Sequence, residues 1–106
     1  MIFLPNLITL IMNLTDFLNP TDKDVLAWKV FNQQGSATLL SIKQNAVLKE
    51  HQSISDAMLL LLQGQASYQE DERTVELTSP MDYVLIPARV THRVIGKEDA
   101  LMLLIH

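Results

Sequence analysis

The sequence contains no cysteine, which excludes disulfide bridges, thiolate nucleophiles and sulfur-ligated zinc. A chain without cysteine suits a reducing compartment, so we expect a cytoplasmic protein. Positive charge is also scarce, because 8 Lys and Arg residues stand against 12 Asp and Glu and are scattered along the chain. No basic stripe is present that could hold a phosphate backbone, so nucleic-acid binding is not expected.

The N-terminal segment Met1–Leu14 is apolar, which raises the question of a targeting signal. The segment has no positive residues at its start and no small-residue cleavage site, and Pro5 and Asn6 interrupt a run too short to span a bilayer. We therefore expect neither export nor membrane insertion. Two alternatives stay open: the natural start is Met12, or Ile2–Ile11 is an arm that docks on a neighbouring subunit.

The 106 residues, 48% of them hydrophobic, are enough for one domain with a single core. Residues 13–20 have the capping and proline signals of a short helical turn. After Pro20, turn signals recur every eight to twelve residues and no long amphipathic segment follows. This pattern predicts an all-β sandwich or barrel of eight or nine strands, in which residues 23–106 form the barrel and residues 1–22 form an arm.

The central stretch contains six consecutive apolar residues, Ala57 to Leu62, and is closed by Gly64. Such a run between turn signals is typical of a strand buried on both faces, and Leu101–Ile105 has the same character. One face of each strand fills the barrel. The other face must also leave water, so we expect a homodimer formed by sheet stacking.

A second stretch, Ser79–His92, contains another short apolar strand, which is closed by Pro87 and followed by His92. The central strand is preceded by His51. The two stretches together predict a small barrel with two histidines directed into its interior.

These two stretches resemble the two motifs of the cupin superfamily, G-x5-H-x-H-x3,4-E-x6-G and G-x5-P-x-G-x2-H-x3-N. His51 and Gly64 match the first motif, and Pro87 and His92 match the second at the correct spacing from each other. The resemblance covers roughly Val25 to Ile105. It implies a cupin-like double-stranded β-helix, or jelly-roll barrel, with a short N-terminal arm.

Half of the metal ligands that the resemblance implies are absent. The second motif histidine falls on Ser53 and the glutamate on Ala57, which leaves His51 and His92. A divalent metal generally needs three protein ligands, so Fe, Mn, Ni or Zn would require a further carboxylate. Asp56 and Glu50 are the candidates, although strand alternation turns both away from the interior. A bulge near residues 53–55 could bring Asp56 inward.

The second motif departs from the family pattern as well. Its two glycines fall on Met81 and Arg89, and its asparagine falls on Gly96. An arginine in a turn that usually holds glycine, beside His92, could bind the carboxylate of a ligand. A solvated turn is the simpler interpretation of Arg89.

The preferred function is a barrel that binds a small, mostly apolar molecule with one polar or acidic group and has a reduced metal site, with no resident metal expected. The alternatives are a metal-dependent enzyme of the oxygenase or isomerase type on the two histidines, metal-free acid–base chemistry, and a purely structural dimer. Strand parity places two leucines beside the histidines. The predicted ligand-binding residues are His51, Ser53, Leu59, Leu61, Arg89 and His92.

Overall fold

A computed structural model describes residues 11–19 and 21–106. Within these ranges the chain forms one short 3₁₀ helix, η1, and nine strands. The elements are η1 Leu14–Phe17, β1 Val25–Asn32, β2 Ser36–Ile42, β3 Val47–His51, β4 Ala57–Gln63, β5 Ala66–Glu70, β6 Thr74–Leu77, β7 Tyr83–Ile86, β8 His92–Gly96 and β9 Ala100–Ile105.

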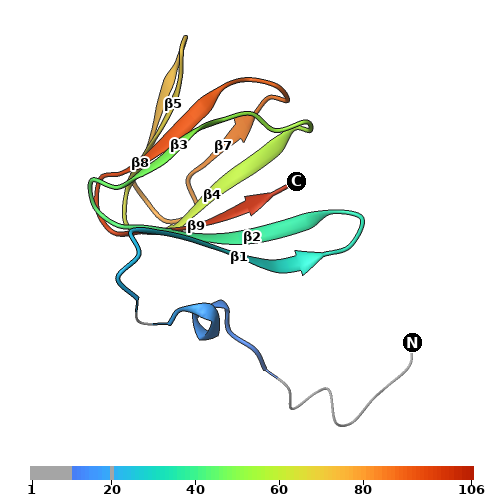
Figure 1. The fold of residues 1–106 in the computed structure, drawn as a ribbon, viewed down its shortest axis with the longest axis vertical. Helices are drawn as coiled ribbons and strands as arrows, with labels where there is room; N and C mark the ends of the chain where they lie inside the picture. The colour runs from blue at the N-terminus through green and yellow to red at the C-terminus, as the bar shows by residue number, and fades with distance from the viewer. Residues whose placement is uncertain (1–10, 20) are drawn as a thin grey trace.

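The strands form two antiparallel sheets that face each other (Figure 1). One sheet has the order β1-β2-β9-β4-β7 and the other has the order β3-β8-β5-β6. Neighbours in each sheet are mostly distant in sequence, as when β2 pairs with β9 and β3 with β8. The sequence prediction of an all-β, jelly-roll barrel is confirmed.

The core lies between the inner faces of the two sheets, and β4 shows how the sequence builds it. Alternate residues of a strand point to opposite faces. Ala57, Leu59 and Leu61 are 8%, 1% and 0% exposed and belong to the core cluster. Met58, Leu60 and Leu62 are only half-buried on the outer face. The predicted parity of this strand is confirmed.

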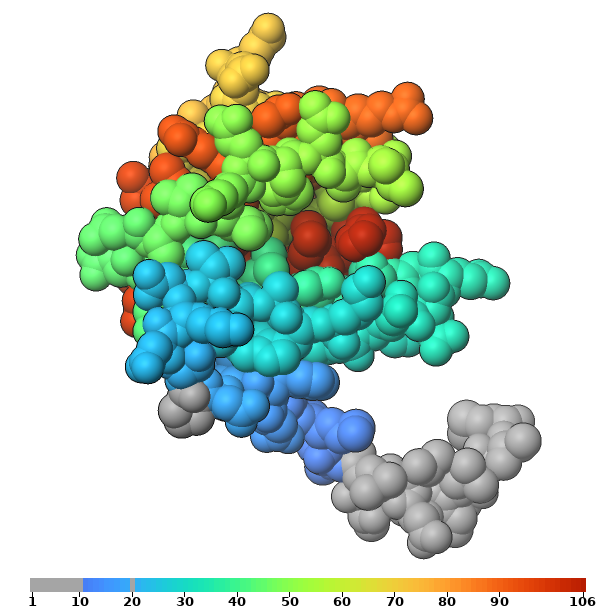
Figure 2. All heavy atoms as spheres, viewed as in Figure 1, coloured from blue at the N-terminus to red at the C-terminus, as the bar shows by residue number. Residues whose placement is uncertain are grey.

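The segment before the barrel contains η1, which lies within the helical turn predicted for residues 13–20. Asn13 caps it, because its side-chain oxygen accepts a hydrogen bond from the Thr15 main-chain N–H at 2.9 Å. The segment lies beneath β1 and β2 in the space-filling view (Figure 2). Residues 1–10 lie outside the described residues. They include most of the predicted docking arm, Ile2–Ile11, so both alternatives for the N-terminus stay predictions. No helix in the described ranges is long and apolar enough to cross a membrane.

Four residues adopt the left-handed backbone conformation at positions where the cupin motifs carry glycine, and the first of them is Asn45 with a φ of 67°. Gly64 has a φ of 79°, Met81 a φ of 78° and Arg89 a φ of 65°. A residue with a Cβ atom pays roughly 1 to 2 kcal/mol in this region, whereas glycine does not. The backbone geometry of the second motif is therefore kept although both glycines have been replaced.

Replacing Met81 with glycine is expected to stabilise the protein by about 1 kcal/mol, because it removes this backbone strain. The Met81 side chain is 69% exposed, so little burial is lost. The measurement is the free energy of unfolding in urea. Met81→Ala serves as the control, since it removes the same side chain but keeps the Cβ atom, and it should bring no comparable gain.

Candidate functional site

His51 and His92 lie side by side on the four-stranded sheet. His51 ends β3, His92 begins β8, and the two residues are directly paired across the strands. A bulge in β3 between Leu48 and His51 adjusts the register that makes this pair. The ring centroids are 4.1 Å apart at an interplanar angle of 63°. Two residues 41 positions apart in the sequence thus form one imidazole pair.

Each imidazole is held by a main-chain carbonyl two residues earlier in the chain. The Nδ1 atom of His51 lies 2.9 Å from the Lys49 oxygen, and Nδ1 of His92 lies 3.0 Å from the Val90 oxygen. A carbonyl oxygen only accepts hydrogen bonds, so Nδ1 carries the hydrogen in both rings. In the neutral imidazole, Nε2 is then the atom with the free lone pair.

His92 is buried, at 3% exposed, whereas His51 is exposed. Burial disfavours the imidazolium and lowers the pKa of His92 below its ordinary value of 6.5. The neighbouring His51 lowers this pKa further, while the Val90 carbonyl and Glu70 raise it. His92 is therefore neutral at pH 7 and presents the Nε2 lone pair.

The Nε2 atom of His92 reaches accessible space. Among the described residues, no fully buried side-chain nitrogen or oxygen lacks a hydrogen-bond partner. His92 bonds through Nδ1 to Val90 and has no second hydrogen bond within the described ranges. The small exposed part of this side chain must therefore include Nε2, which is available to a ligand.

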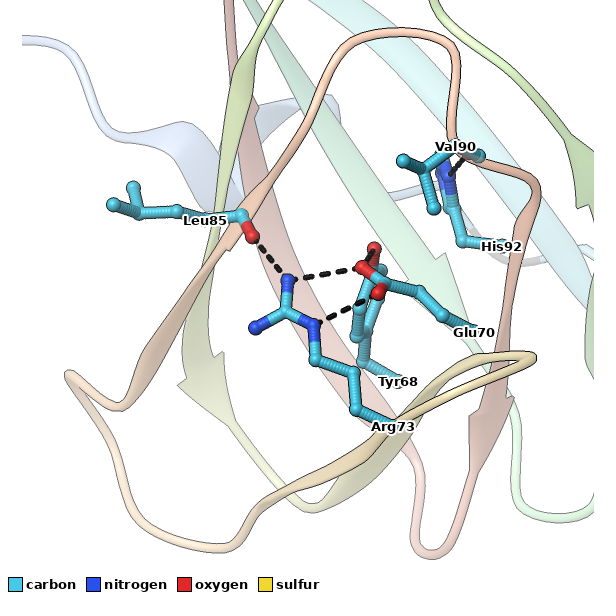
Figure 3. Close-up of polar contacts among 6 residues, drawn as sticks. All are labelled: Tyr68, Glu70, Arg73, Leu85, Val90 and His92. Carbon is cyan, nitrogen blue, oxygen red and sulfur yellow. Dashed lines mark hydrogen bonds and ion pairs between the residues drawn. The ribbon is translucent and has the colours of Figure 1, made fainter.

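Beside the imidazole pair lies a second group, formed by Tyr68 and Glu70 on β5 and Arg73 at the following turn (Figure 3). The Tyr68 hydroxyl donates to the Glu70 carboxylate at 2.5 Å, and Arg73 donates to both carboxylate oxygens at 2.9 Å. The Tyr68 ring lies 5.5 Å from the His92 ring. We call these three residues together with His51 and His92 the mouth cluster.

Arg73 also joins the edges of the two sheets. Its Nη2 atom donates to the Leu85 carbonyl at 2.6 Å (Figure 3). Leu85 belongs to β7, the edge strand of the five-stranded sheet, whereas Arg73 directly precedes β6, the edge of the other sheet. One guanidinium therefore holds Glu70 and closes the seam between β6 and β7.

The charges in this group stabilise one another. The hydrogen bonds from Arg73 are the largest cause that lowers the pKa of Glu70, and the Tyr68 hydroxyl lowers it further. Burial, together with the hydrogen bond to Glu70, raises the pKa of Tyr68. At neutral pH the Tyr68 hydroxyl is thus a protonated donor, Glu70 is ionised and Arg73 balances its charge.

No family model and no curated protein matches the chain, but solved structures do. A cupin superfamily protein from Desulfitobacterium hafniense DCB-2 is 25% identical, with 89% of this chain and 86% of that chain covered and a TM-score of 0.77. A cupin-2 domain protein from Shewanella frigidimarina is 15% identical over 91% and 93% of the two chains, with a TM-score of 0.72. This chain has the fold of a small cupin domain. The fold is also similar to KdgF from Halomonas sp., with 21% identity, coverage of 82% and 83%, and a TM-score of 0.71.

The other predicted ligand-binding residues make contacts within their own loops or in the core. The Ser53 hydroxyl donates to the Ser55 carbonyl in its own loop. The Arg89 main-chain N–H donates to the Ser53 carbonyl at 2.7 Å, and the Arg89 side chain is exposed. Leu59 and Leu61 are packed in the core. The predicted role of these four residues in ligand binding stays a prediction.

A cupin metal centre of three protein ligands does not fit the residues present. Asp56 accepts a hydrogen bond from the Ala88 main-chain N–H, and Glu50 is exposed. Glu70 is engaged by Tyr68 and Arg73. Within residues 11–19 and 21–106 no three His, Cys, Asp or Glu side chains are grouped so that they could hold a metal ion. The two imidazoles offer lone pairs, but Asp56 and Glu50 do not complete a site with them.

A cavity of about 270 Å³ lies beside the mouth cluster, which contributes Glu70 and His92 to its lining, and extends over Gln69 and Arg93 on the outer face of the four-stranded sheet. The sequence predicted a largely apolar pocket, because strand parity directs Leu59 and Leu61 into the barrel. Parity does not show how tightly these side chains pack. Leu59 and Leu61 are instead packed among the other core residues and do not line this cavity. The lining residues are Glu50, Gln69, Glu70, Asp71, Thr91, His92 and Arg93.

Sequence reasoning missed Tyr68, Glu70 and Arg73. Residues 70–73 have the composition of an exposed hairpin loop, whereas Glu70 is the last residue of β5 and its side chain is only 10% exposed. The available signal was parity, since Ala66, Tyr68 and Glu70 alternate on one face of β5. The register that sets Glu70 opposite His92 required the structure.

Proposed function

We propose that this cupin domain binds a small polar molecule that carries hydroxyl or amine hydrogen-bond donors at the mouth cluster. The observation that supports the proposal is the pair of imidazoles whose Nδ1 atoms are tied to main-chain carbonyls. In their neutral forms both rings present Nε2 as an acceptor. Two adjacent acceptors select a ligand that donates hydrogen bonds.

The charges around the cavity support the same class of ligand. Glu50 and Asp71 line it, and Glu72 lines a neighbouring cavity that shares Asp71. Arg73 gives three of its five N–H donors to Glu70 and the Leu85 carbonyl. Arg93 lines the cavity too, against the three carboxylates of Glu50, Glu70 and Asp71. A neutral or cationic ligand is therefore favoured over the acidic one that the sequence suggested.

The size of the cavity limits the ligand. A volume of about 270 Å³ lies at the lower end of the range typical of small-molecule sites. Because the interior is packed by leucines, the ligand sits at the rim and stays partly solvated. We therefore expect weak, reversible binding, suited to sensing or sequestration.

The proposal is tested by nuclear magnetic resonance of the histidine ring nitrogens with three probes, xylitol, 1,4-diaminobutane and succinate. We expect xylitol or the diamine to shift the His92 Nε2 resonance, and succinate to leave it unchanged. Binding should weaken as the pH falls through the lowered pKa of His92, since protonation removes the lone pair.

The matched variants are His92→Phe, which should abolish the response, and His106→Phe, which should preserve it. His106 is the third histidine and lies at the chain end, where Nε2 contacts the Ser36 hydroxyl. A response to succinate alone would contradict the proposal, and so would a lack of response to all three probes at millimolar concentration.

A further inference from the structure

The accessible space beside the mouth cluster is longer than one cavity. The cavity of about 270 Å³ adjoins a second of about 320 Å³, and both are lined by Glu70, Asp71 and Thr91. Together they run across the ends of β3, β8 and β5, which are neighbours in the four-stranded sheet, to the β5–β6 hairpin. We call them the double cavity. The remaining lining residues are Glu50, Gln69, His92 and Arg93 in the first cavity and Glu72 and Val90 in the second.

Negative charge predominates along the double cavity. Its charged lining groups are four carboxylates and one guanidinium, those of Glu50, Glu70, Asp71, Glu72 and Arg93. Within the described residues, Arg73 and Glu70 form the one ion pair between side chains. The other three carboxylates therefore have no ion-pair partner there, and the cavity attracts cations.

The unpaired carboxylates are concentrated at the hairpin end of the double cavity. Asp71 and Glu72 form the tip of the hairpin, which is closed by the Glu70 main-chain N–H donating to the Arg73 carbonyl at 2.8 Å. Arg93 lines only the first cavity, and its Nε atom donates to a neutral side-chain amide at 2.8 Å. Among the described residues, no positively charged side chain lines the second cavity.

In the first cavity, His92 adds an acceptor that is independent of the carboxylates. Its side chain is only 3% exposed, and its Nδ1 atom is held by the Val90 carbonyl. Its Nε2 atom has no hydrogen-bond partner within the described ranges and reaches the cavity that His92 lines. A nearly buried acceptor directed into an acidic cavity indicates a ligand that donates hydrogen bonds and carries positive charge.

The spread of these groups favours an extended organic cation over a metal ion. Within residues 11–19 and 21–106, no three His, Cys, Asp or Glu side chains are grouped so that they could hold a metal ion. An alkylammonium group carries three N–H donors. One such group can meet Nε2 of His92, and a second can meet the carboxylates at the hairpin end. The methylene groups between them would lie along Val90 and Thr91.

We propose that the ligand of the mouth cluster is a linear polyamine, bound across the double cavity with one ammonium group at His92 and another at Asp71 and Glu72. This inference rests on the proposed function and narrows its ligand class to alkyl chains with two or more ammonium groups. Two linked ammonium groups bind more tightly than one, because the second meets its carboxylates without a further loss of translational freedom.

The test is a titration of the full chain, followed by the His92 ring nitrogen resonances, with 1,4-diaminobutane, spermidine, 1-aminobutane and xylitol. We expect the diamine and spermidine to bind about tenfold or more tightly than 1-aminobutane, which has the same four-carbon chain but a single charge. This advantage should shrink several-fold between about 20 and 200 mM NaCl, because the carboxylates at the hairpin tip are exposed and salt screens them.

The double variant Asp71→Asn/Glu72→Gln should weaken diamine binding about tenfold and leave the response to 1-aminobutane unchanged. Asp22→Asn/Glu98→Gln is the matched control. It makes the same two chemical changes at exposed positions that line neither cavity, and it should leave diamine binding unchanged.

Equal affinities for 1,4-diaminobutane and 1-aminobutane would overturn this inference, and so would diamine binding that the hairpin variant does not weaken. If xylitol still shifts the His92 resonance in either case, the proposed polar site stands and only the polyamine class is lost. A lack of response to all four probes at millimolar concentration would overturn the inference together with the proposed function.

Discussion

A Gly64→Ala protein is expected to lose most of its folding stability. Gly64 sits in the turn between β4 and β5 with a φ of 79°, and a Cβ atom there would lie 2.0 Å from the Asp99 carbonyl oxygen and 3.0 Å from Ala100 Cα. These are main-chain atoms, so no side-chain rotation relieves the overlap. Left-handed strain and main-chain displacement together cost roughly 3 to 5 kcal/mol.

Such a loss is a large fraction of the 5 to 15 kcal/mol typical of a domain. Urea unfolding followed by circular dichroism measures it. Gly35→Ala is the control, because the nearest atom to its new Cβ is the His106 carbonyl oxygen at an ordinary 3.5 Å. Wild-type stability in Gly64→Ala would show that the turn can move away from Asp99, contrary to the packing described.

An Arg73→Met protein is expected to lose roughly 2 to 3 kcal/mol at pH 7, because Glu70 would keep its charge beside Tyr68 without its counterion. The Glu70 side chain is only 10% exposed, so water cannot fully replace the guanidinium. The bond to the Leu85 carbonyl would be lost as well. Methionine keeps most of the apolar length of arginine, which isolates the electrostatic part.

The pH dependence gives this prediction a second readout. In the wild type the pKa of Glu70 is lowered, so its contribution to stability is present at neutral pH and is lost as the pH falls below the usual value of 4.5. The difference between Arg73→Met and the wild type should therefore shrink in acid. Adding Glu70→Gln to Arg73→Met should restore part of the stability at pH 7.

Arg93→Met is the control for the loss of a guanidinium. Arg93 is exposed on the outer face of the four-stranded sheet and donates to the neutral Gln69 amide oxygen. Its replacement should cost less than about 1 kcal/mol. Equal losses for the two variants would mean that the Arg73–Glu70 pair has no special role in holding the mouth cluster.

Much of the fold could be predicted from local pattern because strand parity is a local property. The apolar run of β4 predicted which side chains fill the barrel, and Ala57, Leu59 and Leu61 are buried as expected. The spacing from Pro87 identified His92 as the second histidine of the pair. Its pairing with His51 follows from the antiparallel contact between β3 and β8. The backbone is left-handed at Met81 and Arg89, where the second cupin motif carries glycine.

The composition of the mouth cluster could not be predicted, because it depends on register between distant strands. Glu70 and Arg73 are three residues apart and look like an ordinary solvated ion pair in sequence. Only the pairing of Glu70 with His92, the hydrogen bond from Tyr68 and the reach of Arg73 to Leu85 make them part of a site. The packing of Leu59 and Leu61 in the core could not be predicted either, because the space between the sheets depends on side chains from both of them.

The sequence by itself determined the all-β class, the inner and outer parity of β4, the two histidines and the reduced ligand set. These properties depend on residue identity and on periods of two residues, which the linear chain contains in full. The tertiary structure alone decided which side chains surround the histidines and where the cavity opens. Those properties arise where strands far apart in sequence are brought side by side by hydrogen-bond register.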